Sequence, residues 1–193
     1  MIQMYHHKNG LKLSLLEEEH LQTLKELKDE SWFGTHGITF NNMLQQKNWY
    51  NHLDNQTSMV FIVYKDEEAV GTYKLKYIDW ISRSYTSSHD VFKEHRGKGL
   101  SKPVLEAGID FGFEVLNMNR LDTEVLENNI ASLKSALWVG FQKEGVRRKA
   151  VHKCGDYLDS IFLGILREDW EDLDRVKKYG GICNLSYTPK NDL

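Results

Sequence analysis

The chain has 193 residues, of which 40% are hydrophobic and 27% charged, and its formal net charge is −3. A chain of this length is most economically a single domain that can bury a core, and its mild acidity gives no sign of a nucleic-acid-binding surface. Its mean hydropathy of −0.54, together with the absence of a long apolar run, predicts no membrane-spanning segment.

The amino terminus and the cysteines indicate the cellular compartment in which we expect the protein. Residues 1–8 lack the apolar core of a secretory signal peptide. Cys154 and Cys183 are too few for a disulfide framework, and neither shows metal-binding spacing with a histidine. We therefore expect free thiols, no metal site and a cytoplasmic protein that has neither nucleic acid nor a membrane as a partner.

The first half of the chain predicts strands and helices in turn. Alternating apolar and polar side chains are typical of a strand, whereas leucines three residues apart after an acidic turn are typical of a helix. Two alternating runs separated by a short polar turn predict a hairpin. In chain order the predicted elements are a strand at 11–15, a helix at 17–29, a loop at 31–37, a helix at 39–53 with Thr39 as its cap, and hairpin strands at 59–64 and 69–80.

The second half predicts a further strand, a glycine-rich turn and a long helix, followed by three strands and two helices. Asn129 stands where a helix N-cap is expected. Together the elements predict an α/β (α+β) fold, a single domain over residues 1–193 with its core at about 10–170 and a short C-terminal extension. A central mixed, mostly antiparallel sheet is flanked by helices. These later elements are strands at 85–92, 121–126, 141–152 and 156–166, a helix from Ser101 to Leu116, one after Asn129 and one at 169–177.

The most informative segment is R-G-K-G-L-S at residues 96–101, between a predicted strand and the long helix. Free N–H groups at a helix start lie at the positive end of the helix dipole and can bind phosphate. Glycine lets the main chain approach a ligand closely, and Lys98 and Lys102 add positive charge. A helix start that needs glycine only for its turn is the alternative. The segment is neither a Walker loop nor a GxGxxG fingerprint.

The segment resembles motif A of the GNAT N-acetyltransferase superfamily, [QR]-x-x-G-x-[GA], with Arg96, Gly99 and Ser101 at the defined places. Serine at the last place is a mild departure. Residues 127–132 (ENNIAS), followed by Gly140-Phe141, resemble motif B of the same family.

Residues 155–170 are similar to the last strand of one GNAT branch, which holds ribosomal-protein N-terminal, spermidine and amino-sugar acetyltransferases. The resemblance covers about residues 10–170. It implies a single GNAT-like domain and acetyl-CoA as cosubstrate, with the glycine loop holding the pyrophosphate.

The resemblance also implies which residues contact acetyl-CoA. Val91 and Phe92 pair with the pantetheine amides as an added strand would, where the parallel strands separate near Phe92 and Val125. Asn129 is expected to cap its helix and to contact the pantetheine arm, although a cap alone would also explain it. The predicted cofactor-binding residues are Val91, Phe92, Arg96, Gly97, Lys98, Gly99, Leu100, Ser101, Lys102 and Asn129.

The usual catalytic residues of the family are missing. The position of its motif B tyrosine, a general acid, holds Ala136, and the position of its glutamate base holds Tyr85. His89 and Asp90 are candidate substitutes that a strand places on opposite faces, and a histidine with near-neutral pKa is a natural proton acceptor. Tyr85 is a candidate donor to the leaving group. Alternatively each is structural, and catalysis consists mainly of positioning the substrates.

The acceptor site should come from the variable first part of the fold, where an aromatic platform suits a sugar and a carboxylate suits an amine. The candidates are Trp32, Phe33, His36, Trp49 and Asp79, each of which has a packing role as its alternative. The N-W-Y around Trp49 resembles some amino-sugar acetyltransferases.

The predicted activity is acetylation of a primary amine on a small molecule, an amino sugar or a peptide N-terminus. Transfer is expected to be direct within a ternary complex, because no cysteine or serine stands in a nucleophile elbow. The alternatives are a non-catalytic acyl-CoA-binding sensor or subunit with the same fold, and a structural module whose loop binds nothing. A homodimer stays open.

Overall fold

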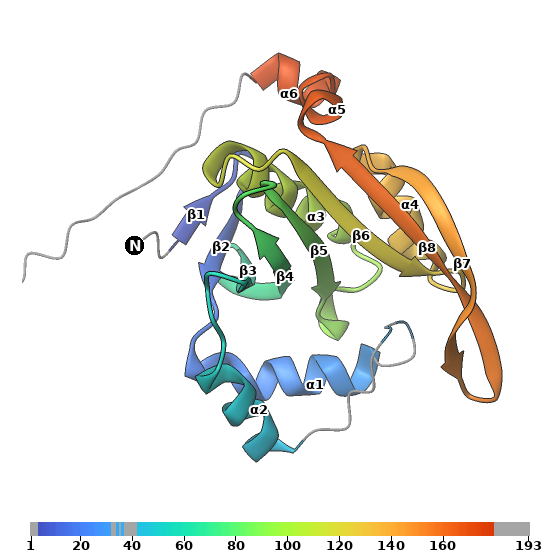
Figure 1. Ribbon diagram of the computed structural model, residues 1–193. Helices are drawn as coiled ribbons and strands as arrows, with labels where there is room; N and C mark the ends of the chain where they lie inside the picture. The colour runs from blue at the N-terminus through green and yellow to red at the C-terminus, as the bar shows by residue number, and fades with distance from the viewer. Residues whose placement is uncertain (1–3, 32–33, 35, 37–41, 180–193) are drawn as a thin grey trace, which may run out of the picture.

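The computed structural model describes residues 4–31, 34, 36 and 42–179. Within these residues eight strands form one sheet, in the spatial order β1-β2-β3-β4-β5-β6-β8-β7 (Figure 1). Every neighbouring pair is antiparallel except β5 and β6, which confirms the predicted mixed, mostly antiparallel sheet. The strands are β1 Met4–His6, β2 Leu11–Leu15, β3 Ser58–Lys65, β4 Glu68–Asp79, β5 Ser84–Val91, β6 Arg120–Leu126, β7 Gln142–Lys153 and β8 Asp156–Leu166.

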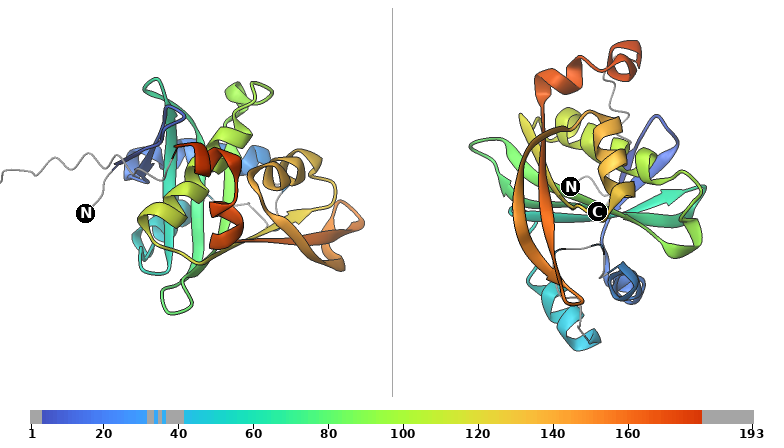
Figure 2. Two further views of the ribbon diagram at one scale, coloured as in Figure 1. Left: turned by 90° about the horizontal axis from the view of Figure 1, so that it is seen from above. Right: turned by 90° about the vertical axis from the view of Figure 1, so that its right-hand side faces the viewer.

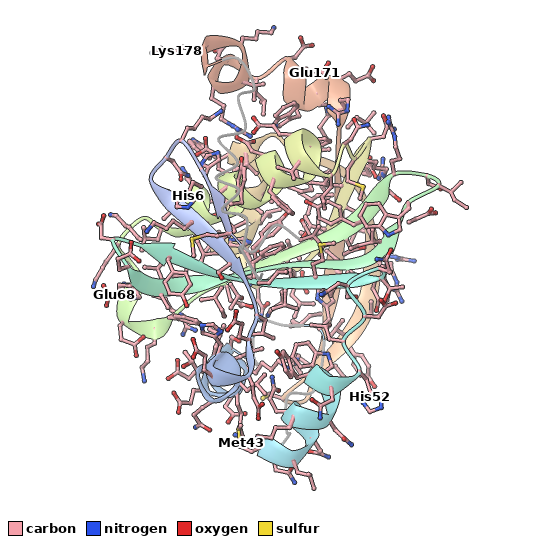
Figure 3. The ribbon with its side chains drawn as sticks, turned by 90° about the vertical axis from the view of Figure 1, so that its left-hand side faces the viewer. His6, Met43, His52, Glu68, Glu171 and Lys178 are labelled. Atoms are coloured by element: carbon pink, nitrogen blue, oxygen red, sulfur yellow. The ribbon has the colours of Figure 1, made fainter. Side chains whose placement is uncertain are left out.

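Helices cover both faces of this sheet. Figure 3 shows α1 and α2 on one side and α3 on the other, with α5 and α6 beyond α3. The long hairpin of β7 and β8 curves along one side of the molecule (Figure 2). Among the described helices, none has both the length and the apolar character needed to cross a membrane. The helical elements are η1 Glu18–His20, α1 Leu21–Ser31, α2 Met43–Asn51, η3 Lys93–His95, α3 Ser101–Asp110, the π-helical turn η4 Phe111–Val115, α4 Ile130–Val139, α5 Arg167–Glu171 and α6 Asp174–Tyr179.

The larger core lies between the sheet and α3. Gly108 and Gly112 let this helix approach the strands, because an added Cβ would lie 2.2 Å from the Tyr73 ring and 2.3 Å from the Tyr85 hydroxyl, respectively. The predicted helix from Ser101 to Leu116 has regular α-helical bonding only to Asp110 and continues as a π-helical turn.

A smaller core lies on the opposite face, where the leucines of α1 pack on β3. Leu21, Leu24 and Leu27 contact a cluster that includes Ile62 and Phe92, as the spacing of the leucines predicts. The cap of α2 is Asn42, whose Oδ1 accepts a hydrogen bond from the Gln45 N–H at 2.9 Å. The predicted cap Thr39 lies outside the described residues. Strand β1 was not predicted from the sequence.

Asp110 fastens the end of α3 to the terminal segments of the described chain. Its fully buried carboxylate accepts hydrogen bonds from Trp170 Nε1 and Arg175 Nη1, each at 2.7 Å, and lies 3.0 Å from His7 Nε2. Burial alone would raise the pKa of Asp110, but the hydrogen bond to His7 and the charge of Arg175 hold it at about 2. His7, Glu106 and Asp110 bring potential metal ligands within 4.8 Å of one another, yet protein donors already occupy both oxygens of Asp110.

Candidate active site

A gap opens in the middle of the sheet, where the only parallel pair in the described sheet separates. Strands β5 and β6 stay in register for three residue pairs, from Ser84–Arg120 to Thr86–Asp122. One residue further on, the Thr123 hydroxyl donates to the carbonyl oxygen of Ser87 at 3.1 Å. The strands therefore separate earlier than the predicted point near Phe92 and Val125.

Along this gap the N–H and C=O groups of successive β5 residues point alternately toward β4 and toward the gap. The Phe92 N–H donates to the Val70 carbonyl oxygen of the neighbouring strand at 3.0 Å. In an antiparallel pair the hydrogen-bonded residues alternate with residues whose N–H and C=O groups point the other way. The main chains of Val91 and His89 therefore face the gap. Phe92 does not, which corrects its prediction as a partner of pantetheine, since its ring also packs against the α1 cluster.

The glycine loop adopts the conformation that its sequence requires. Gly97 and Gly99 have φ angles of +75° and +77°, a left-handed region that favours glycine. A Cβ at either position would meet no atom within 4 Å, so both face open space. The first helical hydrogen bond of α3 runs from the Val104 N–H to the Leu100 oxygen at 3.0 Å. The N–H groups of Ser101 and Lys102 precede it and are free of the helical ladder.

The first cavity, of about 740 Å³, lies beside this loop. The end of α1, strand β5, the loop and the start of α4 enclose it. It brings together most of the predicted cofactor-binding residues: Val91, Arg96, Gly97, Gly99, Leu100, Ser101 and Asn129. Phe92, Lys98 and Lys102 do not line it. Lys102 instead places its Nζ 4.8 Å from the centre of the Trp138 ring.

The second cavity, of about 560 Å³, adjoins the first and shares lining residues of β5 with it. Its lining is rich in charged, aromatic and hydroxyl side chains from distant parts of the sequence. They include Lys28 of α1, Trp49 of α2, Lys74 and Lys76 of β4, Thr86 and Ser88 of β5, Asp122 and Glu124 of β6, Phe162 of β8, and His36. The residues that line both cavities are Ser31, Gly34, His89, Asp90, Asn129 and Ser132. The two cavities therefore meet at β5 and the start of α4, and we call this shared wall the junction.

A family model described as an acetyltransferase (GNAT) domain matches residues 13–162. The chain belongs to the GNAT acetyltransferase family. The SPbeta prophage-derived N-acetyltransferase YokL of Bacillus subtilis is 28% identical over 84% of this chain and 93% of its own length. The spermidine N(1)-acetyltransferase of Escherichia coli is 26% identical over 84% of this chain and 89% of its own.

Solved structures show the same fold for this acetyltransferase. The spermidine N-acetyltransferase of Vibrio cholerae, in complex with CoA and spermine, superimposes with a TM-score of 0.77 at 22% identity. The match covers 84% of this chain and 99% of that one. The protein is thus an enzyme that uses acetyl-CoA, rather than the sensor or the structural module that the sequence left open.

At the junction of this acetyltransferase, His89 and Asp90 point to opposite faces of β5. His89 Nε2 lies 2.9 Å from the Ser101 hydroxyl, which in turn lies 3.0 Å from that of Ser135. Burial lowers the pKa of His89 to about 4, so the expected near-neutral pKa is wrong and the ring is uncharged at pH 7. Asp90 accepts a hydrogen bond from Lys74 Nζ at 3.0 Å.

The structure separates three other predicted positions from the cavities. Tyr85 is 1% exposed, and its hydroxyl lies 2.8 Å from that of Tyr73. Burial raises the pKa of Tyr85 well above its usual value, and it lines neither cavity, so its prediction as a proton donor is wrong. Ala136 is buried on α4. Asp79 is exposed and accepts hydrogen bonds from Ser82 and the Ile81 N–H, outside both cavities.

Of the predicted acceptor residues, His36 and Trp49 line the second cavity. Trp32 and Phe33 lie outside the described residues. His36 Nε2 lies 2.8 Å from the Ser160 hydroxyl and 3.5 Å from Glu124, and burial lowers the pKa of this histidine. The Asn129 Oδ1 accepts from the Ser132 N–H at 3.2 Å, which gives α4 the predicted cap.

Sequence reasoning predicted Asp90 but missed the lysines of the second cavity and its two acids on β6. Alternation offered a signal, because Lys74 and Lys76 of β4 share one face, as do Asp122 and Glu124 of β6. Only the fold shows that these faces converge with Lys28 on one cavity.

Proposed function

We propose that this acetyltransferase moves the acetyl group of acetyl-CoA directly to a primary amine in a ternary complex. The acceptor is a small molecule, an amino sugar or a peptide N-terminus. Coenzyme A occupies the first cavity and the acceptor the second. The observation that supports this most is the junction, since His89, Asp90, Asn129 and Ser132 border both cavities. Two substrates held there have their reacting groups at one place.

In this proposal the main chain binds most of the cosubstrate. The N–H groups of residues 97–102 bind the pyrophosphate at the start of α3. The main-chain groups of His89 and Val91 that face the gap pair with the pantetheine amides, as an added strand would. Asn129 lies beside this arm while its side chain caps α4 and donates to the Gly34 oxygen at 3.3 Å.

The chemistry needs a neutral amine, a polarised thioester and a route for one proton. The N–H of His89 that faces the gap is placed to donate to the thioester oxygen as negative charge develops there. Asp90, whose carboxylate is paired with Lys74 and borders both cavities, accepts a proton of the acceptor amine through water. As the C–N bond forms the C–S bond breaks, and coenzyme A leaves as a thiolate that takes a proton from water. His89 is uncharged and fixes the Ser101 hydroxyl at 2.9 Å. Positioning supplies much of the remaining rate.

The amine panel that tests this proposal contains spermidine, a nucleotide-linked amino sugar and peptides with free N-termini. We expect thiol release from acetyl-CoA with at least one of them, and no release from any would contradict the proposal.

A structure of the Vibrio cholerae spermidine N-acetyltransferase is dodecameric, so we extend the proposal to self-association of this chain, testable by light scattering.

Direct transfer has its own test. Cys154 is exposed in the turn between β7 and β8 and lines neither cavity, and Cys183 lies outside the described residues. Replacing both with serine is expected to leave turnover within about twofold of the wild type, because an exposed thiol away from the junction has no part in the transfer. Labelled acetyl retained on the wild-type protein after gel filtration would show that an acyl-enzyme forms instead.

A further inference from the structure

The carboxylates of the second cavity are already neutralised by the protein. Each one that lines the cavity has a basic side chain beside it, so none is left free to bind a cationic acceptor on its own. The pairs are Asp90 with Lys74 at 3.0 Å, Asp122 with Arg120 at 2.9 Å, and Glu124 with Arg147 at 3.8 Å, and Arg120 also pairs with Glu144.

Two lysines of the same cavity are not neutralised in this way. Lys28 donates to the neutral Gln46 amide oxygen at 3.0 Å and lies 4.4 Å from the centre of the Trp49 ring. Lys76 has no hydrogen bond or ion pair with any residue that the structure describes. Both are partly buried, and a partly buried cation without an anion carries a desolvation cost. Among the charged residues of the lining, Lys28 and Lys76 are therefore the two without a counter-ion in contact within the described structure.

The pKa shifts of these two lysines agree with a site that binds an anion. Burial, with a contribution from the charge of Lys74, lowers the pKa of Lys28 to about 8 and also lowers that of Lys76. A bound anion would favour the protonated forms, so its binding at pH 8 should take up protons. Lys28 and Lys76 line the same cavity as Asp90 of the junction, and the charge of Asp90 favours the protonated form of both lysines, as that of Glu124 does for Lys76.

We infer that the acceptor carries an anionic group, a carboxylate or a phosphate, which Lys28 and Lys76 bind while its amine lies at the junction. This inference rests on the proposed function and names the class of acceptor. Trp49 and Phe162 line the cavity with aromatic rings, against which the remaining part of the acceptor can pack. A polyamine would instead bring several positive charges against the two lysines, at a cost that grows in the low-dielectric cavity.

The experiment compares amines that differ only in the anion. Glucosamine 6-phosphate against glucosamine tests the phosphate, glycylglycine against glycylglycinamide tests the carboxylate, and spermidine represents the polycation. In at least one pair we expect kcat/KM for the amine that carries the anionic group to exceed that of its partner without this group by about thirtyfold. This ratio corresponds to an electrostatic contact of roughly 2 kcal/mol. Equal values within both pairs, or a preference for spermidine, would overturn the inference.

Variants assign the effect to the two lysines. The double variant Lys28→Met/Lys76→Met keeps the length of both side chains and is expected to raise KM for the anionic amine at least tenfold. Its kcat and its KM for the neutral amine should stay within about twofold, because only the anion contact is lost. Lys143→Met, on the exposed part of β7 and away from both cavities, is the matched control. An unchanged KM in the double variant would contradict the assignment.

A binding measurement separates this inference from the proposed function. Glucose 6-phosphate, glucose, acetylglycine and acetylglycinamide carry no amine and are titrated into protein saturated with coenzyme A, so that the first cavity is filled. Binding of an anionic compound that the double variant loses would uphold the anion site even if no amine is acetylated. Acetylation of amines without any such binding would uphold the activity and refute the anion site.

Discussion

The two cavities that meet at β5 are lined by residues that are distributed differently along the chain. The first is bordered mainly by residues of one short stretch, 89–101, together with the start of α4, and the free main-chain N–H groups at the start of α3 lie in that stretch. The second is bordered by side chains of α1, α2, β4, β6 and β8. A main-chain site is fixed once the loop and helix form, whereas a side-chain site can change with each substitution. One fold can therefore keep its cosubstrate-binding site while the residues that bind the acceptor change.

The largest effect is expected in the first cavity. Gly99→Asp puts a side chain and an anion into the open space beside the loop, where we place the pyrophosphate. Binding of coenzyme A, measured by calorimetry, should weaken at least a thousandfold, which is roughly 4 kcal/mol. Gly155→Asp is the matched control, because Gly155 has a φ of +93° and open space around it but lies outside both cavities. Equal affinities in the two variants would refute the assignment of this loop.

A smaller effect is expected at the junction. Asp90→Asn removes the proposed proton acceptor and the partner of Lys74, so kcat should fall about a hundredfold, as is typical of lost acid–base catalysis. The affinity for coenzyme A should stay within about threefold, since the main chain holds it. Asp156→Asn, at the exposed start of β8, controls for a change in charge. A variant with full kcat would assign Asp90 a structural role only.

The second cavity should respond to side-chain truncation where the first does not. Trp49→Ala removes an aromatic wall, and KM for the acceptor should rise about tenfold, which corresponds to roughly 1.4 kcal/mol. The dissociation constant of coenzyme A should not change. Trp138→Ala is the control, because Trp138 is 51% exposed on α4 and lines neither cavity. A rise in the coenzyme A dissociation constant alone would contradict the division between the cavities.

The last effect concerns stability as a function of pH, and not binding or turnover. Because the pKa of His89 falls to about 4 on folding, from an ordinary 6.5, the unfolded chain binds a proton between these values that the folded chain does not. The stability of the wild type should therefore fall as the pH decreases from about 6.5 to 4, with no contribution from His89 above that window. His89→Asn should lose this part of the dependence, and His152→Asn, an exposed position, should keep it. If the melting temperatures of the wild type and of His89→Asn changed equally with pH, the assignment of this dependence to His89 would be contradicted.

Local signals in the sequence sufficed for the first cavity. The strand, the glycine turn, the start of α3 and the Asn129 cap follow from residues close together in the chain. The end of α3 at Asp110 has no signal in the local sequence, since the apolar periodicity continues to Leu116, and the close fit of Gly108 and Gly112 against two tyrosines of the sheet is seen only in the fold. Tyr85 was misassigned for the same reason, since strand alternation does not say which face meets α3. Lys28 lies on α1 and Lys74 and Lys76 lie on β4, and only the fold brings them together around the second cavity.

The most direct measurement for the arrangement of the two cavities is a crystal structure of the protein in complex with coenzyme A. The account predicts the pyrophosphate within hydrogen-bonding distance of main-chain N–H groups between residues 97 and 102. The pantetheine arm should run along His89 and Val91, with its thiol at the junction beside Asp90. A pyrophosphate bound by Lys28 and Lys76, or an arm that avoids the gap between β5 and β6, would contradict the account.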